Sequence, residues 1–275
     1  MTRLRGEDIL DRAENLKEYN QQLINNVGKA LWEIAAHANG VANGYKQAEF
    51  NDLGQFGSVA IIPISSGQGI ISGFSRTVQK IIEFLGFPAF VTGEPDVGGL
   101  AEAVEKGGKV IFLADDDHFV AINMAKGKVV DNGKATGKGY AAALDLMSGG
   151  LRDKKVLLLG AGPVGRGAAA FMSMQGAKVF VYDIDRQHAE KLTDAVPGAQ
   201  IVQDFHKALP EYKLLFDATP SAEIIGKEFI REDTMIAAPG IPLGLSQECL
   251  PLLAGRLVHD MLEIGVATML FEALA

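Results

Sequence analysis

The sequence is poor in the residues that build disulfides and metal sites. A single cysteine, Cys249, excludes an internal disulfide, and five histidines without ligand spacing make a zinc site unexpected. Basic residues are also fewer than acidic ones, 26 against 34. The resulting net charge of −8 argues against nucleic acid or a membrane surface as a partner. No apolar run approaches the roughly 20 residues of a membrane span, and no apolar core follows residues 1–8 as in a signal peptide. We therefore expect a cytoplasmic protein without metal.

Apolar residues, in contrast, are plentiful. The 275 residues are 48% hydrophobic and 22% charged, which allows one large domain or two of medium size. Strand-like runs alternate with helical patterns, which indicates an α/β fold. We expect an N-terminal α/β substrate domain with leading helices over 1–135 and a Rossmann dinucleotide-binding domain over 136–275. The last helix, about 265–274, is apolar nearly all round, so we expect it to be buried on the first domain or on a second subunit.

A glycine fingerprint organises the second domain. Four apolar residues, 156–159, run into Gly160-Ala161-Gly162-Pro163-Val164-Gly165, and a helical run of small residues follows. In this strand–turn–helix arrangement the first glycine permits the tight turn, the second lets a pyrophosphate approach, and the third lets helix and strand pack closely. The helix N-terminus then offers N–H groups to phosphate oxygens. The alternative is a glycine-rich turn that binds nothing.

An acidic residue stands where a ribose-binding acid is expected. The apolar run 179–182 ends in Asp183, which is 23 positions after Gly160, and Ile184 follows it. An acid here accepts hydrogen bonds from the adenosine ribose and repels a 2′-phosphate, so NAD is favoured over NADP. Two later turns, Thr219-Pro220 and Pro239-Gly240, follow strands and are expected to touch ribose and nicotinamide, although either could be an ordinary strand-ending turn.

The first domain shows a similar alternation. We expect helix over 7–36 with a break near Tyr19-Asn20, and a loop-rich stretch to residue 57. Strands at 59–64, 89–91 and 109–113, with helices at 74–85 and about 96–106, predict a parallel sheet. Residues 126–139 are polar and glycine-rich, which suggests a crossing between domains, and a short helix over 140–147 leads into the second domain.

Two polar turns of the first domain are candidates for chemistry. Asp115-Asp116-Asp117 follows a strand, and adjacent carboxylates are expected to raise one another's pKa toward that of a general base. The alternative is a solvated acidic turn. The segment 65–69, Ser-Ser-Gly-Gln-Gly before a helix, could hold a substrate carboxylate or be a capped helix start. Asp260, beside His259, is a further candidate acid or a structural one.

Several stretches together resemble the pyrrolysine synthase (PylD) family. They are Pro63 to Ile71 with Phe74-Ser75, Pro95 to Gly99, Ala114-Asp115-Asp116 with Phe119, Ala238 to Pro242, and Gly265 to Leu270. The start, Leu4 followed by Glu7-Asp8, is also similar. The glycine fingerprint is common to many dehydrogenases, whereas the other blocks are more particular.

The resemblance implies an NAD-dependent dehydrogenase of the last step of pyrrolysine biosynthesis. Its small-molecule substrate is the isopeptide 3-methylornithyl-N6-lysine, whose terminal amine is oxidised so that the product cyclises. By the same resemblance Asp115 transfers a proton, and the substrate is contacted by Leu4, Ser65, Ser66, Phe74 and Asp260. Asp260 stands where the family pattern has Glu, which shortens the reach of that acid.

Two other readings stay open, and so does the oligomeric state. The chain could be another NAD-linked amino-acid or amine dehydrogenase, or an NAD-binding sensor without catalysis. A homodimer is expected from the apolar last helix. The cofactor residues expected under all three readings are Gly160, Gly162, Pro163, Val164, Gly165, Asp183, Ile184, Thr219, Pro220, Pro239 and Gly240.

Overall fold

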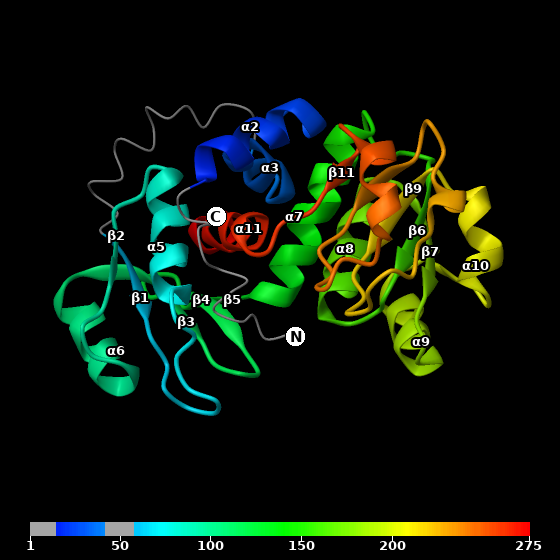
Figure 1. Cartoon of the computed structure of the whole chain (residues 1–275). Helices are drawn as coiled ribbons and strands as arrows, with labels where there is room; N and C mark the ends of the chain where they lie inside the picture. The colour runs from blue at the N-terminus through cyan, green and yellow to red at the C-terminus, as the bar shows by residue number, and fades with distance from the viewer. Residues whose placement is uncertain (1–14, 42–57) are drawn as a thin grey trace. The chain divides into compact units, whose positions relative to one another are not determined.

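The computed structural model describes residues 15–41 and 58–275, and the chain forms two compact units (Figure 1). Of the described residues, unit 1 comprises 15–20, 31–41, 58–135 and 262–275, and unit 2 comprises 21–30 and 136–261. Each unit is built around one β-sheet. Among the described residues, no helix has both the length and the apolar character needed to cross a membrane.

The sheet of unit 1 has five strands in the order β2-β1-β3-β4-β5. Their bounds are β1 Ser58–Ile62, β2 Ala89–Val91, β3 Gly108–Ala114, β4 Phe119–Asn123 and β5 Lys128–Asp131. The predicted parallel pairing holds for β2-β1-β3 only, because β3-β4 and β4-β5 are antiparallel. The turns 115–118 and 124–127 are four residues long, too short for the crossover that a parallel pair needs. The predicted crossing between domains at 126–139 contains the boundary of the two units, because unit 1 runs to Ala135 and unit 2 resumes at Thr136. The segment is not a loop, since it includes β5 and the start of a helix at Asn132.

Helices cover both faces of this sheet. Alternate residues of β1, Ala60 and Ile62, pack with Ala103 of α6 (Asp96–Glu105). The intervening residues of β1 point to the opposite face, where α5 (Phe74–Phe84) contacts β1 and β2. Figure 1 shows α5 and α6 next to this sheet. The arrangement places the loops after β1 and β3 at one edge, because parallel strands end together.

The last helix, α11 (Glu263–Leu274), is buried as predicted. It contacts α3 (Leu31–Ala38), α5, β4 and β5, all in unit 1. Its last carbonyl groups accept hydrogen bonds from Asn123, Lys126 and Lys128 of the β4-β5 hairpin. Donors and cations at a helix C-terminus stabilise it. Since the apolar surface of α11 has partners inside the chain, the homodimer stays a prediction without this support.

The long helix predicted at the N-terminus is interrupted later than expected. Helix α2 (Leu16–Val27) runs through Tyr19-Asn20, where the break was predicted, and ends at Val27, directly before Gly28. Gly28 has φ +75°, a left-handed conformation that favours glycine after a helix. Asn20 lies in the helix but its side chain accepts the N–H of Leu31, the first residue of α3. This hydrogen bond ties α2 to the start of α3.

The sheet of unit 2 has six parallel strands in the order β11-β10-β9-β6-β7-β8. Their bounds are β6 Lys155–Leu159, β7 Lys178–Tyr182, β8 Gln200–Ile201, β9 Leu214–Asp217, β10 Met235–Ala237 and β11 Leu257–Val258. The chain runs outward from β6 to β8 and then returns to β9 on the other side of β6. This reversal is the switch point at which Rossmann folds bind ligands. The predicted α/β fold with a C-terminal Rossmann domain is confirmed.

Helices and short 3-10 turns connect these strands. The helices are α7 (Asn132–Met147), α8 (Pro163–Met174), α9 (Arg186–Ala195) and α10 (Phe205–Ala208), and the 3-10 turns are Leu209–Glu211, Lys227–Phe229, Gln247–Cys249 and Pro251–Leu253. Helix α7 begins eight residues before the predicted 140. The glycines of this segment suggested a loop, but Gly137 allows close helix packing. A Cβ on Gly137 would lie 1.9 Å from the carbonyl oxygen of Val164 in α8. Close helix contact, and not a loop, explains this glycine.

Candidate active site

The glycine loop after β6 has the geometry of a phosphate-binding turn. Gly160 has φ +91°, and a Cβ on Gly165 would lie 1.9 Å from the Gly160 oxygen. The structure itself therefore requires both glycines. Gly162 differs, because a Cβ there would meet nothing within 4 Å. The space beside Gly162 is open, as close approach of a pyrophosphate requires.

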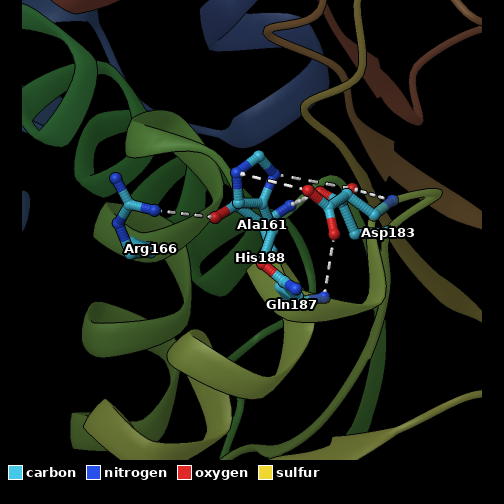
Figure 2. A network of polar contacts seen from close by, with 6 residues as sticks. Ala161, Arg166, Asp183, Gln187 and His188 are labelled. Atoms are coloured by element: carbon cyan, nitrogen blue, oxygen red, sulfur yellow. Dashed lines mark hydrogen bonds and ion pairs between the residues drawn. The ribbon is translucent and has the colours of Figure 1, made fainter.

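Helix α8 begins directly after this loop. Pro163 is its first residue, and Gly162 before it is extended and provides no side-chain cap. The N–H groups of the first turn, Val164 and Gly165 among them, therefore lie at the positive end of the helix without a capping side chain. Arg166 is turned back, and its guanidinium donates to the Ala161 oxygen at 3.1 Å (Figure 2). This helix start can bind a pyrophosphate.

Asp183 joins the end of β7 to the glycine loop. Its Oδ2 accepts the Ala161 N–H at 2.6 Å, and its Oδ1 accepts the Asp185 N–H at 2.8 Å (Figure 2). Asp185 in turn caps α9 by accepting the Gln187 N–H. Ile184, between the two acids, is 95% exposed. The predicted cofactor residues of this half thus lie together at the carboxyl edge of β6 and β7.

The two later turns also lie together. The Gly240 N–H donates to the backbone carbonyl oxygen of Asp217 at 3.0 Å. A Cβ on Gly240 would lie 2.2 Å from the backbone carbonyl oxygen of Thr219. Thr219-Pro220 and Pro239-Gly240 are therefore packed against each other at the ends of β9 and β10. These ends belong to the half of the sheet beyond the switch point, opposite the half that carries Asp183.

Asp217, the last residue of β9, is a buried acid that the sequence reasoning missed. Its Oδ1 accepts hydrogen bonds from the Thr219 N–H at 3.0 Å and from the Thr219 hydroxyl at 2.7 Å. Its Oδ2 makes no hydrogen bond of good geometry with the described residues and lies against Gly244, where a Cβ would stand 2.0 Å away. The pattern Asp-x-Thr at a strand end was the available signal.

Burial sets the charge state of Asp217. Burial raises the pKa of this carboxyl to about 6, although the Thr219 hydrogen bonds, the Gly244 amide and His259 act in the opposite direction. His259 follows β11, and its Nδ1 lies 2.7 Å from the Ala238 oxygen. A carbonyl oxygen can only accept, so Nδ1 carries the proton in this contact. Asp217 therefore titrates close to the working range of an acid–base group.

Asp260 is held from its backbone. The Tyr140 hydroxyl donates to the Asp260 oxygen at 2.9 Å and accepts the Asp260 N–H at 2.7 Å. Both residues are buried, and Asp260 is 3% exposed. Helix α7 thus fixes the position of this acid, which the sequence reasoning left as either functional or structural.

In unit 1, the acidic turn 115–118 is the hairpin turn between β3 and β4. Asp115 Oδ1 accepts the His118 N–H at 2.7 Å and the Asp117 N–H at 2.8 Å. These hydrogen bonds lower the pKa of Asp115 below its ordinary value. The expectation that the adjacent acids raise this pKa is wrong, because the His118 and Asp117 N–H groups stabilise the charged form and outweigh the small desolvation at this exposed position.

The predicted anion cradle is occupied by the chain's own carboxylates. Asp96 accepts the Ser65 N–H at 2.8 Å and the Ser65 hydroxyl at 2.5 Å, and these hydrogen bonds lower its pKa. Asp116 Oδ2 accepts the Gln68 N–H at 2.8 Å, and a Cβ on Gly67 would lie 2.1 Å from the same oxygen. Helix α5 starts only at Phe74, so the segment 65–69 does not form its N-terminus. The cradle expectation is corrected accordingly.

The remaining predicted substrate residues are placed as follows. Phe74 packs edge-on against Phe119, with 5.2 Å between ring centroids, next to the acidic turn. Ser66 is exposed in the same loop as Ser65. Leu4 lies outside the described residues. The structure thus brings Ser65, Ser66, Phe74 and Asp115 to the carboxyl edge of β1 and β3, whereas Asp260 belongs to unit 2. In the described part of the chain, no three or more His, Cys, Asp or Glu side chains are grouped to hold a metal ion.

Comparisons with known proteins identify both parts of the chain. The family model "Pyrrolysine biosynthesis protein PylD, N-terminal domain" matches residues 8–130, and "Shikimate / quinate 5-dehydrogenase" matches residues 142–238. A pyrrolysine synthase from Methanosarcina acetivorans is 37% identical over 218 residues, which cover 78% of this chain and 82% of the relative. One from Methanosarcina barkeri is 36% identical over 219 residues, covering 78% and 81%. The chain belongs to the pyrrolysine synthase family.

Solved structures show the same fold in other dehydrogenases. Quinate dehydrogenase from Corynebacterium glutamicum, in complex with NAD, matches with a TM-score of 0.55 at 14% identity, covering 79% of this chain and 94% of that one. Shikimate dehydrogenase from Aquifex aeolicus matches with a TM-score of 0.51 at 18% identity, covering 79% and 89%. The pyrrolysine synthase family therefore shares its fold with these enzymes.

Proposed function

We propose that this protein is an NAD-dependent dehydrogenase that carries out the last step of pyrrolysine biosynthesis. The observation that carries the proposal is the match to two relatives named pyrrolysine synthase, which extends over 78% of the chain. The open glycine loop beside Asp183 supports the choice of a dinucleotide cofactor, and the acid favours NAD over NADP.

The proposed substrate is the isopeptide 3-methylornithyl-N6-lysine. Its terminal amine carbon loses a hydride and the nitrogen loses a proton, which gives an imine. Water converts the imine to an aldehyde and ammonia leaves. The ornithine α-amine then condenses with the aldehyde, water is lost, and the pyrroline ring closes. Bound NAD would supply the hydride acceptor for the first step.

Residues of unit 2 would hold the cofactor. The first-turn N–H groups of α8 and the open space at Gly162 suit the pyrophosphate. Asp183 suits the adenosine ribose. Thr219-Pro220 and Pro239-Gly240, on the other side of the switch point, would border the nicotinamide ribose and ring.

Residues of unit 1 would handle the substrate and its proton. An amine must be neutral to expel hydride, so a base has to remove a proton from the ammonium group. We assign this step to Asp115, which follows β3 and is exposed. Its lowered pKa makes it a weaker base but keeps it ionised at neutral pH, so that its charge attracts the ammonium. Ser65, Ser66 and Phe74 are proposed to contact the remainder of the isopeptide, and the same is proposed for Asp260 of unit 2 and for Leu4.

The test is NADH formation at 340 nm with NAD and the isopeptide, with the product mass measured in parallel. We expect NADH together with a product that has lost ammonia and two hydrogens and no carbon. Comparable turnover on simple diamines or amino acids would instead indicate a broader amine dehydrogenase. NAD binding without hydride transfer from any amine would indicate a sensor. The control is Gly165→Val, which cannot keep the glycine loop and should lose NAD binding.

A further inference from the structure

His188 stands beside the acid that is proposed to bind the adenosine ribose. It lies in the first turn of α9, and its Nδ1 is 3.9 Å from Asp183 Oδ1 (Figure 2). Its Nε2 is 3.8 Å from Asp185 Oδ2. Both distances are too long for a direct hydrogen bond. They are close to the separation of about 4 Å that remains when one oxygen atom bridges two polar groups.

A ribose hydroxyl bound to Asp183 would need a hydrogen-bond donor, and His188 can provide one. A ribose hydroxyl can give its proton to a carboxylate, but its own oxygen also needs a donor. The Ala161 and Asp185 N–H groups both donate to Asp183 already, at 2.6 and 2.8 Å. The carboxylate itself can only accept. The ring nitrogen of His188, facing the same Oδ1, can provide the donor.

A second observation points to an adenosine at this edge. Ile184, the residue after Asp183, is 95% exposed, although isoleucine is among the most often buried residue types. An exposed apolar side chain beside two acids and an imidazole offers an apolar contact for a base next to polar groups for a sugar. The combination fits a purine nucleoside.

We propose that His188 is a specificity-determining residue that holds the 2′-hydroxyl of the adenosine ribose together with Asp183. The hydroxyl donates to Asp183 Oδ1 and accepts from the His188 ring. The inference rests on the proposed dinucleotide cofactor and names the group that reads its ribose. Asp185, on the other side of the imidazole, adds a second negative charge that disfavours a 2′-phosphate at the same place.

The experiment compares ligands that differ by one hydroxyl group. Dissociation constants for ADP, 2′-deoxy-ADP and 3′-deoxy-ADP are measured by calorimetry on the full chain and on His188→Leu. We expect the loss of affinity caused by removing the 2′-hydroxyl to shrink about fivefold or more in His188→Leu, the scale of one hydrogen bond. The effect of removing the 3′-hydroxyl should stay unchanged. His188→Gln, which keeps an N–H donor, should restore part of the 2′ preference.

The matched control is Lys191→Gln, which removes a cation one turn further along α9 and should leave both preferences as in the wild type. An equal 2′-hydroxyl effect in wild type and His188→Leu would overturn the assignment of His188 while leaving the dinucleotide site standing. Absence of binding of both ADP and NAD to the wild type would overturn the proposed cofactor and this inference together.

Discussion

Two aspartates lie at strand ends of the two sheets, and their pKa values are shifted in opposite directions. Asp115 follows β3 in unit 1, is exposed, and receives two backbone N–H groups that lower its pKa. Asp217 ends β9 in unit 2, and its burial raises the pKa to about 6. One oxygen of Asp217 receives both hydrogen bonds from Thr219, and the other lies against Gly244 without a well-formed hydrogen bond to the described residues. The position of an acid at a strand end therefore does not decide its charge.

The carboxyl edges of the two sheets also differ in the charge that they present. At the edge of unit 1, Asp96, Asp115 and Asp116 accept backbone N–H groups of the turns around them. At the edge of unit 2, the start of α8 keeps its N–H groups without a capping side chain. The first edge is thus suited to attract a cation and the second to bind an anion. This division agrees with an ammonium substrate on one unit and a pyrophosphate on the other, as proposed.

The largest effect should come from removing the charge at the edge of unit 1. Asp115→Asn keeps an oxygen that can accept the Asp117 and His118 N–H groups, so the turn should fold as before. Turnover of the isopeptide should fall about 10²-fold or more, the usual scale for the loss of a general base. Steady-state NADH formation measures this, and the dissociation constant for NAD should not change. Near-normal turnover would move the base elsewhere, with Asp116 and Asp260 next to be tested.

Asp217 should make stability depend on pH with the opposite sign to an ordinary acid. Its pKa is about 6 when folded, against 3.8 as the ordinary value, so the folded state binds the extra proton between these values. The contribution of Asp217 to the free energy of unfolding is constant below pH 4. It decreases by about 3 kcal/mol as pH rises from 4 to 6. The penalty persists above pH 6. Asp217→Asn should remove this slope, which urea unfolding at a series of pH values measures.

The matched control is Asp204→Asn, because Asp204 is a partly exposed cap of α10 whose pKa is lowered by the Lys207 N–H. Its contribution is present above the ordinary aspartate pKa and is lost as pH falls through the lower folded value. Asp204→Asn should therefore leave the slope between pH 4 and 6 as in the wild type. A wild-type slope that survives in Asp217→Asn would show that another group titrates in this window.

The sequence predicted unit 2 better than unit 1, and the reason is physical. The glycine fingerprint and Asp183 occur at fixed spacing because a strand, a tight turn and a helix must meet a pyrophosphate, so local sequence carries the information. The hairpin after β3 and the carboxylates that occupy the 65–69 loop depend on partners distant in sequence, such as Asp116 with Gln68. Asp217 was missed for the same reason, since its burial against Gly244 comes from a loop 27 residues further on.

A smaller effect than for Asp115 or Asp217 is expected for Asp183. Asp183 is tied to Ala161 and Asp185 by backbone N–H groups, so Asp183→Ala would also release the glycine loop. Asp183→Asn removes the charge and keeps one accepting oxygen, which makes it the cleaner variant. We expect the preference for NAD over NADP to fall about tenfold, the scale of one charge interaction with a 2′-phosphate at a solvent-facing site. The ratio of the two dissociation constants, measured by fluorescence titration of the full chain, gives the answer. An unchanged ratio would remove Asp183 from ribose recognition, and a loss of both affinities in equal proportion would assign it to holding the glycine loop alone.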